Sequence, residues 1–329
     1  DYYNKLSTDL LLERPMPLET GSSTGVMWDN VGKVRNSGIE IGLTTKNIVT
    51  KDWQWSTVFS FSANKNRIVD IDGSKQDNVA AKWFINNPIN VVYGHKITGV
   101  WTAAEAAEAA KYGQYEGQAK ALEVDKNYVI DQKDAVILGH AAPDWTGSFT
   151  SNLVWRDFDF SFSIYAKQGS TVSSPFMIEF TDYKDRGRSK IKMDYYIPAG
   201  TPVLNADGTV GVSSGHNNQK NPYPNNSGTN YGGGTYWGTS NTSDTYDYAN
   251  HCVDASFVKV KNITFGYTVP RKLLSKAGIS NLRVYMNVLN PFVFTDYKGF
   301  DPEWAGASIS DGSGGPSSVT YQFGVNLKF

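Results

Sequence analysis

The stretch that decides the fold is VTYQFGVNLKF, from Val319 to Phe329. Every second side chain in it is large and apolar, and the residues between are polar or small. This period of two is typical of a β-strand with one apolar and one polar face. A soluble β-sandwich can also end on such a strand, so the recurrence of the pattern along the chain is what carries the prediction.

The same alternation recurs in several other segments, and their apolar faces are rich in aromatic residues. We predict further strands near Asp1–Leu12, Gly38–Thr44, Trp53–Asn64, Trp145–Trp155, Phe158–Lys167, Ile263–Tyr267 and Leu282–Val288. With the terminal strand, about eight are expected.

Composition narrows the class of protein. The chain has 329 residues, 19 Tyr, 16 Phe and 9 Trp, and a formal net charge of −1. That charge gives no reason to expect a nucleic-acid partner. No run of apolar residues is long enough for a transmembrane helix. The chain opens on Asp1 and shows no signal peptide, so we expect either a mature protein or a piece of a longer one.

The length of the strand Trp145–Trp155 distinguishes lipid from a soluble core. Ten steps of roughly 3.3 Å, tilted by about 45°, rise roughly 23 Å. That rise matches the apolar band of an outer-membrane barrel, and the two Trp residues fall where aromatic girdles lie. The spacing therefore favours an aromatic face turned to lipid.

Connection lengths point the same way. Short connections are expected at Lys46–Asp52, Arg156–Asp157 and Pro270–Ser280, and long ones at Gly73–Asp144, Gln168–Asp254 and Pro291–Ser318. Outer-membrane barrels alternate short periplasmic turns with long extracellular loops. We therefore predict an all-β fold, a transmembrane antiparallel barrel with long extracellular loops, in which Phe329 lies at the periplasmic rim.

The first long loop carries two local motifs. Thr102 and Glu105 form a capping-box pattern before an alanine-rich run that ends near Gly113, which predicts a short helix. Asp125–Asp134 has carboxylates at a spacing that suits calcium. Its fifth and sixth positions are Val129 and Ile130, where the calcium-loop template needs an oxygen ligand and Gly, so no metal is predicted.

Neither a catalytic set nor a cofactor motif is visible, so we expect no enzyme and no cofactor. Cys252 is the only cysteine, so no intrachain disulfide can form. Aromatic residues of the long loops can stack on sugar rings or grip peptides. We name as substrate-contact candidates Trp83, Tyr93, Trp101, Tyr223, Tyr231, Tyr236 and Trp237.

Several motifs, in order along nearly the whole chain, resemble the C-terminal barrel of SusC/RagA-type TonB-dependent transporters. They include NVGKVRNSGIE (Asn30–Glu40), LGHAAPDWTG (Leu138–Gly147), SFVKVKNITFGYTVP (Ser256–Pro270), GFDPE (Gly299–Glu303) and the ending YQFGVNLKF (Tyr321–Phe329). The resemblance implies that residues 1–329 are the C-terminal portion of a plugged, 22-stranded barrel. The plug domain, the N-terminal strands and the TonB-contacting segment would lie outside this chain.

The resemblance also implies a function and partners. It predicts import of glycans or peptides across the outer membrane of a Gram-negative bacterium, with a SusD-like lipoprotein as lid and TonB, ExbB and ExbD as the energy source. The last strand is expected to act as the assembly signal through Tyr321, Phe323, Val325, Leu327 and Phe329. Two alternatives remain: an autonomous eight-stranded barrel with an anchoring or adhesive role, and a secreted glycan-binding β-domain.

Overall fold

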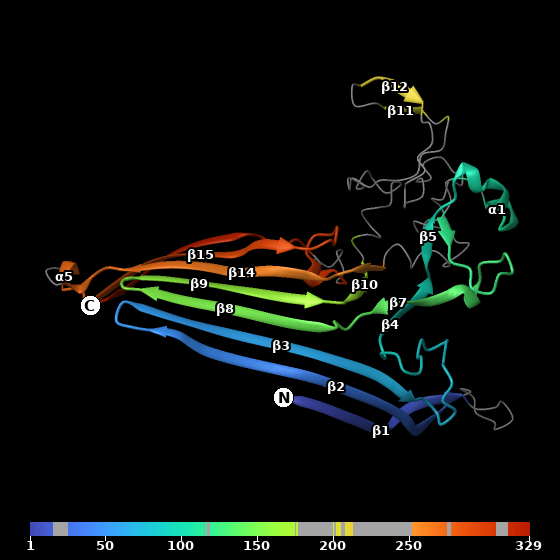
Figure 1. The fold of residues 1–329 in the computed structure, drawn as a ribbon, viewed down its shortest axis with the longest axis horizontal. Coiled ribbons are helices and arrows are strands. Elements are labelled where there is room, and N and C mark those ends of the chain that lie inside the picture. Colours follow the sequence, from blue (N-terminus) through green and yellow to red (C-terminus); the bar gives the residue numbers. More distant parts are fainter. Residues whose placement is uncertain are drawn as a thin grey trace.

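The structure, a computed structural model, is dominated by one long antiparallel sheet with loops gathered at one end (Figure 1). It describes residues 1–15, 26–114, 116, 119–174, 176, 200, 202–204, 208–212, 252–274, 278–306 and 315–329. No helix within these ranges is long and apolar enough to cross a membrane.

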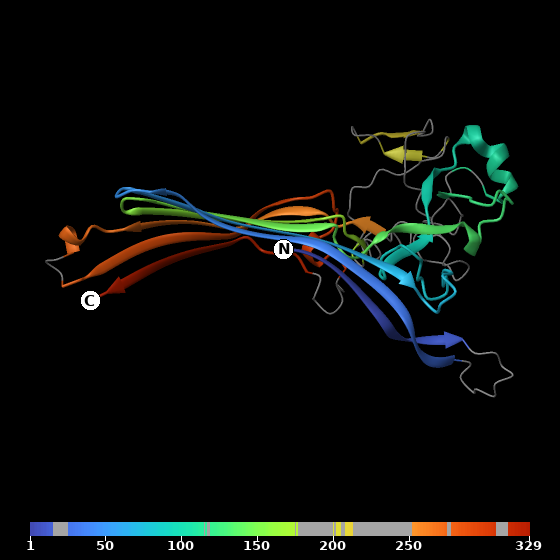
Figure 2. The same cartoon turned by 60° about the horizontal axis from the view of Figure 1, so that its bottom comes forward.

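Eight strands form the main sheet, in the order β1-β2-β3-β8-β9-β14-β15-β16. Their bounds are β1 Tyr2–Pro15, β2 Val26–Val49, β3 Trp53–Asp70, β8 Trp145–Trp155, β9 Phe158–Gln168, β14 Phe257–Thr268, β15 Asn281–Phe294 and β16 Thr320–Lys328. Seen from a second direction, the sheet twists and curves along its length (Figure 2). The predicted all-β class is therefore confirmed, while β1 and β16 leave the sheet open at both edges.

The connections alternate as predicted. Short ones span residues 50–52, 156–157 and 269–280, and they lie at the end of the sheet that also holds Phe329 (Figure 1). We call this the turn end, and the opposite end the loop end. The loop end carries the long connections 71–144, 169–256 and 295–319.

Several predicted strands are longer than expected: β2 already begins at Val26, β14 begins at Phe257, and β15 continues to Phe294. The predicted turn Lys46–Asp52 is shorter, because a bulge between Lys46 and Ile48 restores pairing and β2 continues to Val49. The strand predicted to end at Asn64 continues to Asp70, since Asn66 and Arg67 still pair with β2.

Small elements inside the connections were not predicted, apart from the helix at Thr102. Four short strand pairs join β4 (Val91–His95) to β7 (Ala135–His140), β5 (Ile97–Val100) to β6 (Ala119–Ala121), β10 (Thr171–Ser173) to β13 (Cys252–Asp254), and β11 (Pro202–Leu204) to β12 (Val210–Val212). The helical turns are η2 (Ala103–Glu105), α1 (Ala106–Lys111), η3 (Gln132–Asp134), α5 (Arg271–Leu274) and η5 (Pro302–Trp304).

Strand register gathers the apolar side chains on one face of the sheet. Directly opposed residues share a face, and the opposed pairs include Trp53 with Trp155, Phe59 with Phe149, Leu153 with Phe160, Phe160 with Phe265 and Met286 with Phe323. We call this face the aromatic belt. Many of its rings are exposed, up to 76% for Phe323. The belt is thus a continuous apolar surface across the sheet.

The opposite face is polar and internally hydrogen-bonded. Ser60 and Ser148 lie 2.7 Å apart, the Ser163 hydroxyl donates to Asn262 at 2.8 Å, and Thr264 donates to Asn287 at 2.9 Å. We call this the polar face. Polar side chains of neighbouring strands thus hydrogen-bond to one another on this face, whereas the opposite face carries the aromatic belt.

A glycine makes room for the ion pair of the polar face near the turn end. The Arg283 guanidinium donates two bonds to Asp159, at 2.8 and 2.6 Å. A Cβ at Gly266 would lie 2.3 Å from an Asp159 oxygen and 2.6 Å from Arg283 Nη2. The absence of a side chain at Gly266 is therefore what lets the pair cross β14.

Gly266→Ala is expected to displace this ion pair and destabilise the sheet by about 1–3 kcal/mol, the usual cost of overpacking. Thermal unfolding in detergent measures the effect. Gly42→Ala is the matched control, since nothing lies within 4 Å of a Cβ there. Equal unfolding temperatures for the two variants would contradict the argument.

Candidate functional site

The connection between β15 and β16 folds back over the loop end of the sheet and is anchored there. Its short helix η5 begins after Asp301, whose carboxylate accepts the Glu303 backbone N–H at 2.9 Å. Pro302 occupies the first helical position, where its missing N–H costs nothing. The GFDPE motif therefore encodes a capped helical turn.

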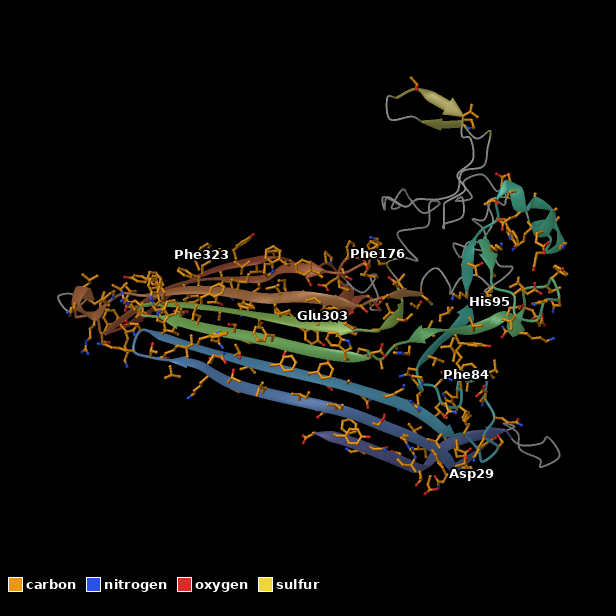
Figure 3. All side chains as sticks on the ribbon, in the orientation of Figure 1. Asp29, Phe84, His95, Phe176, Glu303 and Phe323 are labelled. Carbon is orange, nitrogen blue, oxygen red and sulfur yellow. The ribbon has the colours of Figure 1, made fainter. Side chains whose placement is uncertain are left out.

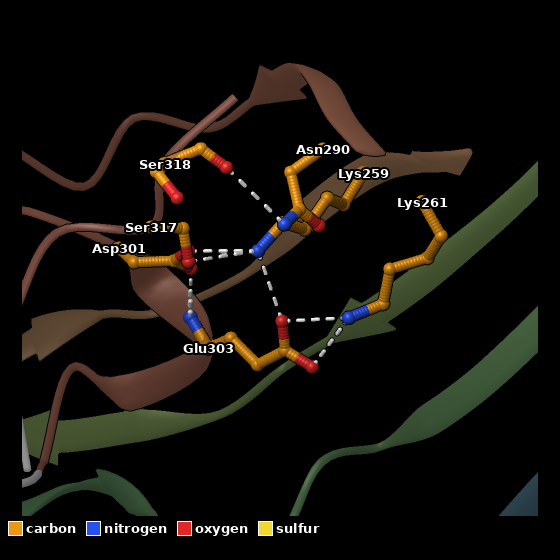
Figure 4. A network of polar contacts seen from close by, with 7 residues as sticks. All are labelled: Lys259, Lys261, Asn290, Asp301, Glu303, Ser317 and Ser318. Atoms are coloured by element: carbon orange, nitrogen blue, oxygen red, sulfur yellow. Dashed lines mark hydrogen bonds and ion pairs between the residues drawn. The ribbon is translucent and has the colours of Figure 1, made fainter. Parts of the chain in front are cut away.

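Two lysines of β14 bind the acidic residues of this turn (Figure 4). The Lys259 Nζ lies 2.7 Å from Asp301 and 3.0 Å from Glu303, and the Lys261 Nζ lies 2.7 Å from Glu303. The Ser317 hydroxyl also donates to Asp301. The Lys259 and Asp301 side chains are only 1% and 2% exposed. We call these five residues the ion cluster.

The ion cluster lies on the polar face. Lys259 is opposed by Tyr165 of β9, a residue of the same face as Ser161 and Ser163. Lys261 is the residue that a bulge between Val260 and Asn262 leaves out of the register. Such bulges redirect side chains, and here both ammonium groups reach η5.

A small apolar core supports the same connection from the side. Ala255, Tyr297 and Ala305 are buried together, with Val172 and Val253 packed against them. The hydroxyls of Tyr297 and Ser174 lie 2.7 Å apart. Tyr297 and Ala305 thereby join the β15–β16 connection to the two ends of the connection between β9 and β14.

Ion pairing changes the titration of both acidic residues. Burial alone would raise the pKa of Asp301 and of Glu303, but hydrogen bonds from Lys259 and Ser317 to Asp301, and from both lysines to Glu303, outweigh it. Both carboxyl pKa values are therefore lowered, and both groups are ionised at neutral pH.

The lowered pKa values predict how the anchor responds to acid. A carboxyl whose folded pKa is lowered stabilises the fold above its ordinary pKa and loses that contribution as the pH falls through the folded value. We expect the connection to stay anchored above pH 4.5, the ordinary value for Glu303, and to loosen only in stronger acid. Hydrogen exchange of the Tyr297–Gly306 amides, corrected for intrinsic rates, measures this. Loosening between pH 7 and 5 would contradict it.

Three of the predicted substrate contacts lie in the connection 71–144, which Figure 3 shows beyond the loop end, around Phe84 and His95. Tyr93 packs on Phe84 with ring centroids 4.7 Å apart. It lines an open hollow of about 740 Å³ together with Lys82, His95 and Asp131. Trp83 lines a separate, smaller hollow. Trp83 and Tyr93 therefore line different hollows.

Trp101 is enclosed rather than open to a substrate. It is 3% exposed, its indole N–H donates to Gln114 at 2.5 Å, and Lys120 lies over its ring at 4.5 Å. The predicted helix around it is confirmed, with the Glu105 carboxylate accepting the Thr102 N–H at 3.1 Å. A direct substrate contact by Trp101 stays a prediction. The other four candidates, Tyr223, Tyr231, Tyr236 and Trp237, lie outside the described residues.

The acidic segment Asp125–Asp134 uses its oxygens to hold a turn. Asp134 is fully buried and accepts the backbone N–H groups of Val124 at 2.7 Å and Asp131 at 3.0 Å. Among the residues with described positions, no cluster of three His, Cys, Asp or Glu could hold a metal. Cys252 is half-buried, and burial raises the pKa of its thiol to about 11. The thiol is therefore protonated at neutral pH.

Sequence reasoning did not find the ion cluster. The order Asp-Pro-Glu was a usable signal for a capped turn. Its lysine partners could not be inferred, because Lys259 and Asp301 are 42 residues apart in the chain.

No protein-family model matches this chain. The chain is 28% identical to TonB-dependent receptor P3 of Formosa agariphila and 30% identical to TonB-dependent receptor SusC of Bacteroides thetaiotaomicron, in each case over all of its residues. It spans about a third of the length of these relatives.

Solved structures agree on the fold. A structure of the RagAB peptide transporter is similar to this chain with a TM-score of 0.65 and 20% sequence identity. The match covers 100% of this chain and 33% of the transporter chain. A second structure, of the RagAB peptide importer in an open-open state, has the same TM-score at 19% identity. The predicted resemblance to SusC/RagA-type receptors is thus confirmed, and so is the predicted location in the outer membrane of a Gram-negative bacterium. The relatives are named as receptors and transporters rather than enzymes.

Proposed function

We propose that this chain is the C-terminal barrel portion of a TonB-dependent receptor that imports glycans or peptides across the outer membrane. The observation that carries the proposal is the aromatic belt, which runs over all strands of the sheet from β2 to β16 while the polar face stays hydrogen-bonded. An apolar surface of this extent is stable against lipid and costly in water. The belt therefore faces the membrane, and the polar face lines the lumen.

Open edges argue for more strands than this chain supplies. β1 and β16 each have a neighbour on one side only. Unpaired backbone groups cost several kcal/mol each in lipid, so spanning sheets close into barrels. Strands and a plug from the rest of a longer protein would close and fill this barrel, which fits a chain that spans about a third of its relatives.

The loop end is proposed to bind cargo for transport and not to catalyse a reaction. Its aromatic residues offer contacts for cargo, and Trp83, Tyr93, Trp101, Tyr223, Tyr231, Tyr236 and Trp237 remain our candidates. The long connections would form the vestibule and the docking surface of a SusD-like lipoprotein. TonB, ExbB and ExbD would act through the part of the receptor outside this chain.

The terminal strand is proposed as the assembly signal. Tyr321, Phe323, Val325 and Leu327 of β16 and Phe329 just after it are between 47% and 81% exposed. Deleting Phe329 is expected to lower the amount of parent receptor in the outer membrane several-fold, measured by immunoblot of membrane fractions. Deleting three residues from a long loop is the control, and unchanged levels after loss of Phe329 would refute the role.

Mass spectrometry of the intact complex, extracted gently in detergent from native membranes, tests the function. A parent chain of roughly three times this length with a co-purifying lipoprotein would support the importer. A single species of 36.3 kDa without a partner would overturn it in favour of an autonomous small barrel.

A further inference from the structure

A hollow of about 790 Å³ lies where β3 loses its neighbour β8. β8 pairs with β3 only as far as Ser62, while β3 runs on toward the loop end (Figure 1). Farther along, the Ile68 backbone N–H donates to the carbonyl of Asn87 at 2.9 Å. Between these two points, β3 has no strand neighbour on this side in the part of the chain that the structure describes, and the hollow lies beside this gap.

The hollow opens on the same face of the sheet as the aromatic belt. Every second residue of a strand shares a face, so the belt residue Phe61 is followed on its face by Ala63, Lys65 and Arg67. These three line the hollow together with Ile39 of β2, which opposes Ala63. A plug would fill the opposite, polar face, and further strands would join at β1 and β16. Neither would cover this hollow.

Its two basic residues lie just above the upper rim of the belt. Trp145, which begins β8, is level with Ala63 in the strand register, and its ring packs on Phe61 with centroids 5.8 Å apart. Lys65 and Arg67 follow Ala63 along β3 and lie about 5 and 9 Å higher for a tilt of about 45°. Lipid headgroups occupy a zone of about this height beyond the hydrocarbon core. Both cations therefore reach the headgroups of the outer leaflet.

The positive charge at this place is not balanced within the described residues. Arg67 directly opposes Arg35 of β2, Lys65 lies on the same face, and all three are exposed. Like charges opposed in this way destabilise a sheet. None of the three is paired with a described carboxylate. Asp144, the one acidic residue among those lining the hollow, lies 3.5 Å from His140 instead. The cluster therefore calls for an anion from outside the chain.

We propose that this hollow binds the phosphate-bearing headgroup of a lipid in the outer leaflet, with Lys65 and Arg67 as the phosphate ligands and Arg35 beside them. Ammonium and guanidinium groups donate charge-assisted hydrogen bonds to phosphate oxygens. An acidic protein segment would meet the same charges, but Ile39 and Ala63 continue the belt into the hollow and offer an apolar wall to acyl chains. The inference rests on the proposed function, which turns the belt to lipid.

Native mass spectrometry of the detergent-purified parent receptor, titrated with lipid A, tests the site. The double variant Lys65→Gln, Arg67→Gln is expected to weaken lipid A binding about tenfold or more, because it loses two charge-assisted hydrogen bonds. Dephosphorylated lipid A should bind weakly, and equally to the parent and to the double variant. The unfolding temperature should not fall, since both side chains are exposed and lie beside a third cation.

Lys5→Gln is the matched control. Lys5 of β1 opposes Asn36, and Asn36 opposes Asn66, which lies between the two proposed ligands in the chain. The control therefore removes a positive charge at the same height but from the polar face. Lipid A binding should be unchanged in this variant.

Each outcome decides the inference. Equal affinity for lipid A in the parent and in the double variant would overturn it, and so would equal affinity of the parent for lipid A and its dephosphorylated form. Complete displacement of lipid A by an equal concentration of inorganic phosphate would overturn the lipid assignment in favour of a free-phosphate site. The import function would survive each of these results, because it is tested separately by the mass and partner of the native complex.

Discussion

Lys259→Met is expected to release the β15–β16 connection from the polar face and to cost about 3–5 kcal/mol, the usual effect of removing one partner of a buried ion pair. The reason is the Asp301 carboxylate, which would remain 2% exposed without its cation. Removing the lysine therefore leaves the Asp301 carboxylate buried without a cation, in addition to deleting the contact. Hydrogen exchange of the Tyr297–Gly306 amides in the parent receptor should rise steeply, and the unfolding temperature should fall.

Lys261→Met is the matched control for this experiment. It deletes an ammonium from the same cluster, but its side chain is 35% exposed and its pair with Glu303 is partly solvated. Such pairs contribute about 1 kcal/mol or less. Equal exchange rates in the two variants would show that burial does not set the strength of the anchor.

A double variant tests the mechanism. Lys259→Met combined with Asp301→Asn removes the unpaired Asp301 carboxylate. The double variant should therefore recover part of the stability lost in Lys259→Met alone. Neighbouring residues of one network are expected to be non-additive in this way. A fully additive result would mean that the two residues act independently, despite the 2.7 Å between them.

The strands were predictable because apolar and polar residues alternate along a barrel strand, so both of its faces can be read from the sequence. Trp145–Trp155 was predicted to the residue, since each position alternates and a tight turn follows at Arg156 and Asp157. The end of β2 was missed because the bulge after Lys46 breaks the period of two for one residue. Local chemistry thus fixes most of a strand, and a single irregularity hides the rest.

Contacts between connections were beyond the reach of sequence reasoning. Tyr297 bonds Ser174 across 123 residues, and Lys259 meets Asp301 only because the connection folds back over β14. No periodicity links such positions.

Phe162→Arg is expected to destabilise the barrel by about 2–4 kcal/mol, the cost of a basic residue on the lipid face near the bilayer midplane. Phe162 is opposed by Ser151 and lies about midway along β9, between the rims marked by Trp145 and Trp155. Its ring packs on Phe149 and Phe160 with centroids 6.0 Å away. Equilibrium urea titration of the parent receptor in phospholipid vesicles measures the change.

Two companion variants make this a test of the membrane assignment rather than of packing. Phe162→Leu removes the aromatic contacts without adding charge, and should cost much less than Phe162→Arg. Ser161→Arg places the same charge one residue away on the polar face, where lumen positions tolerate substitution. Because neighbouring residues of a strand point to opposite faces, the pair isolates the solvent that each face meets. If Ser161→Arg were as harmful as Phe162→Arg, the two faces would share one environment, and the assignment of the aromatic belt to lipid would fail.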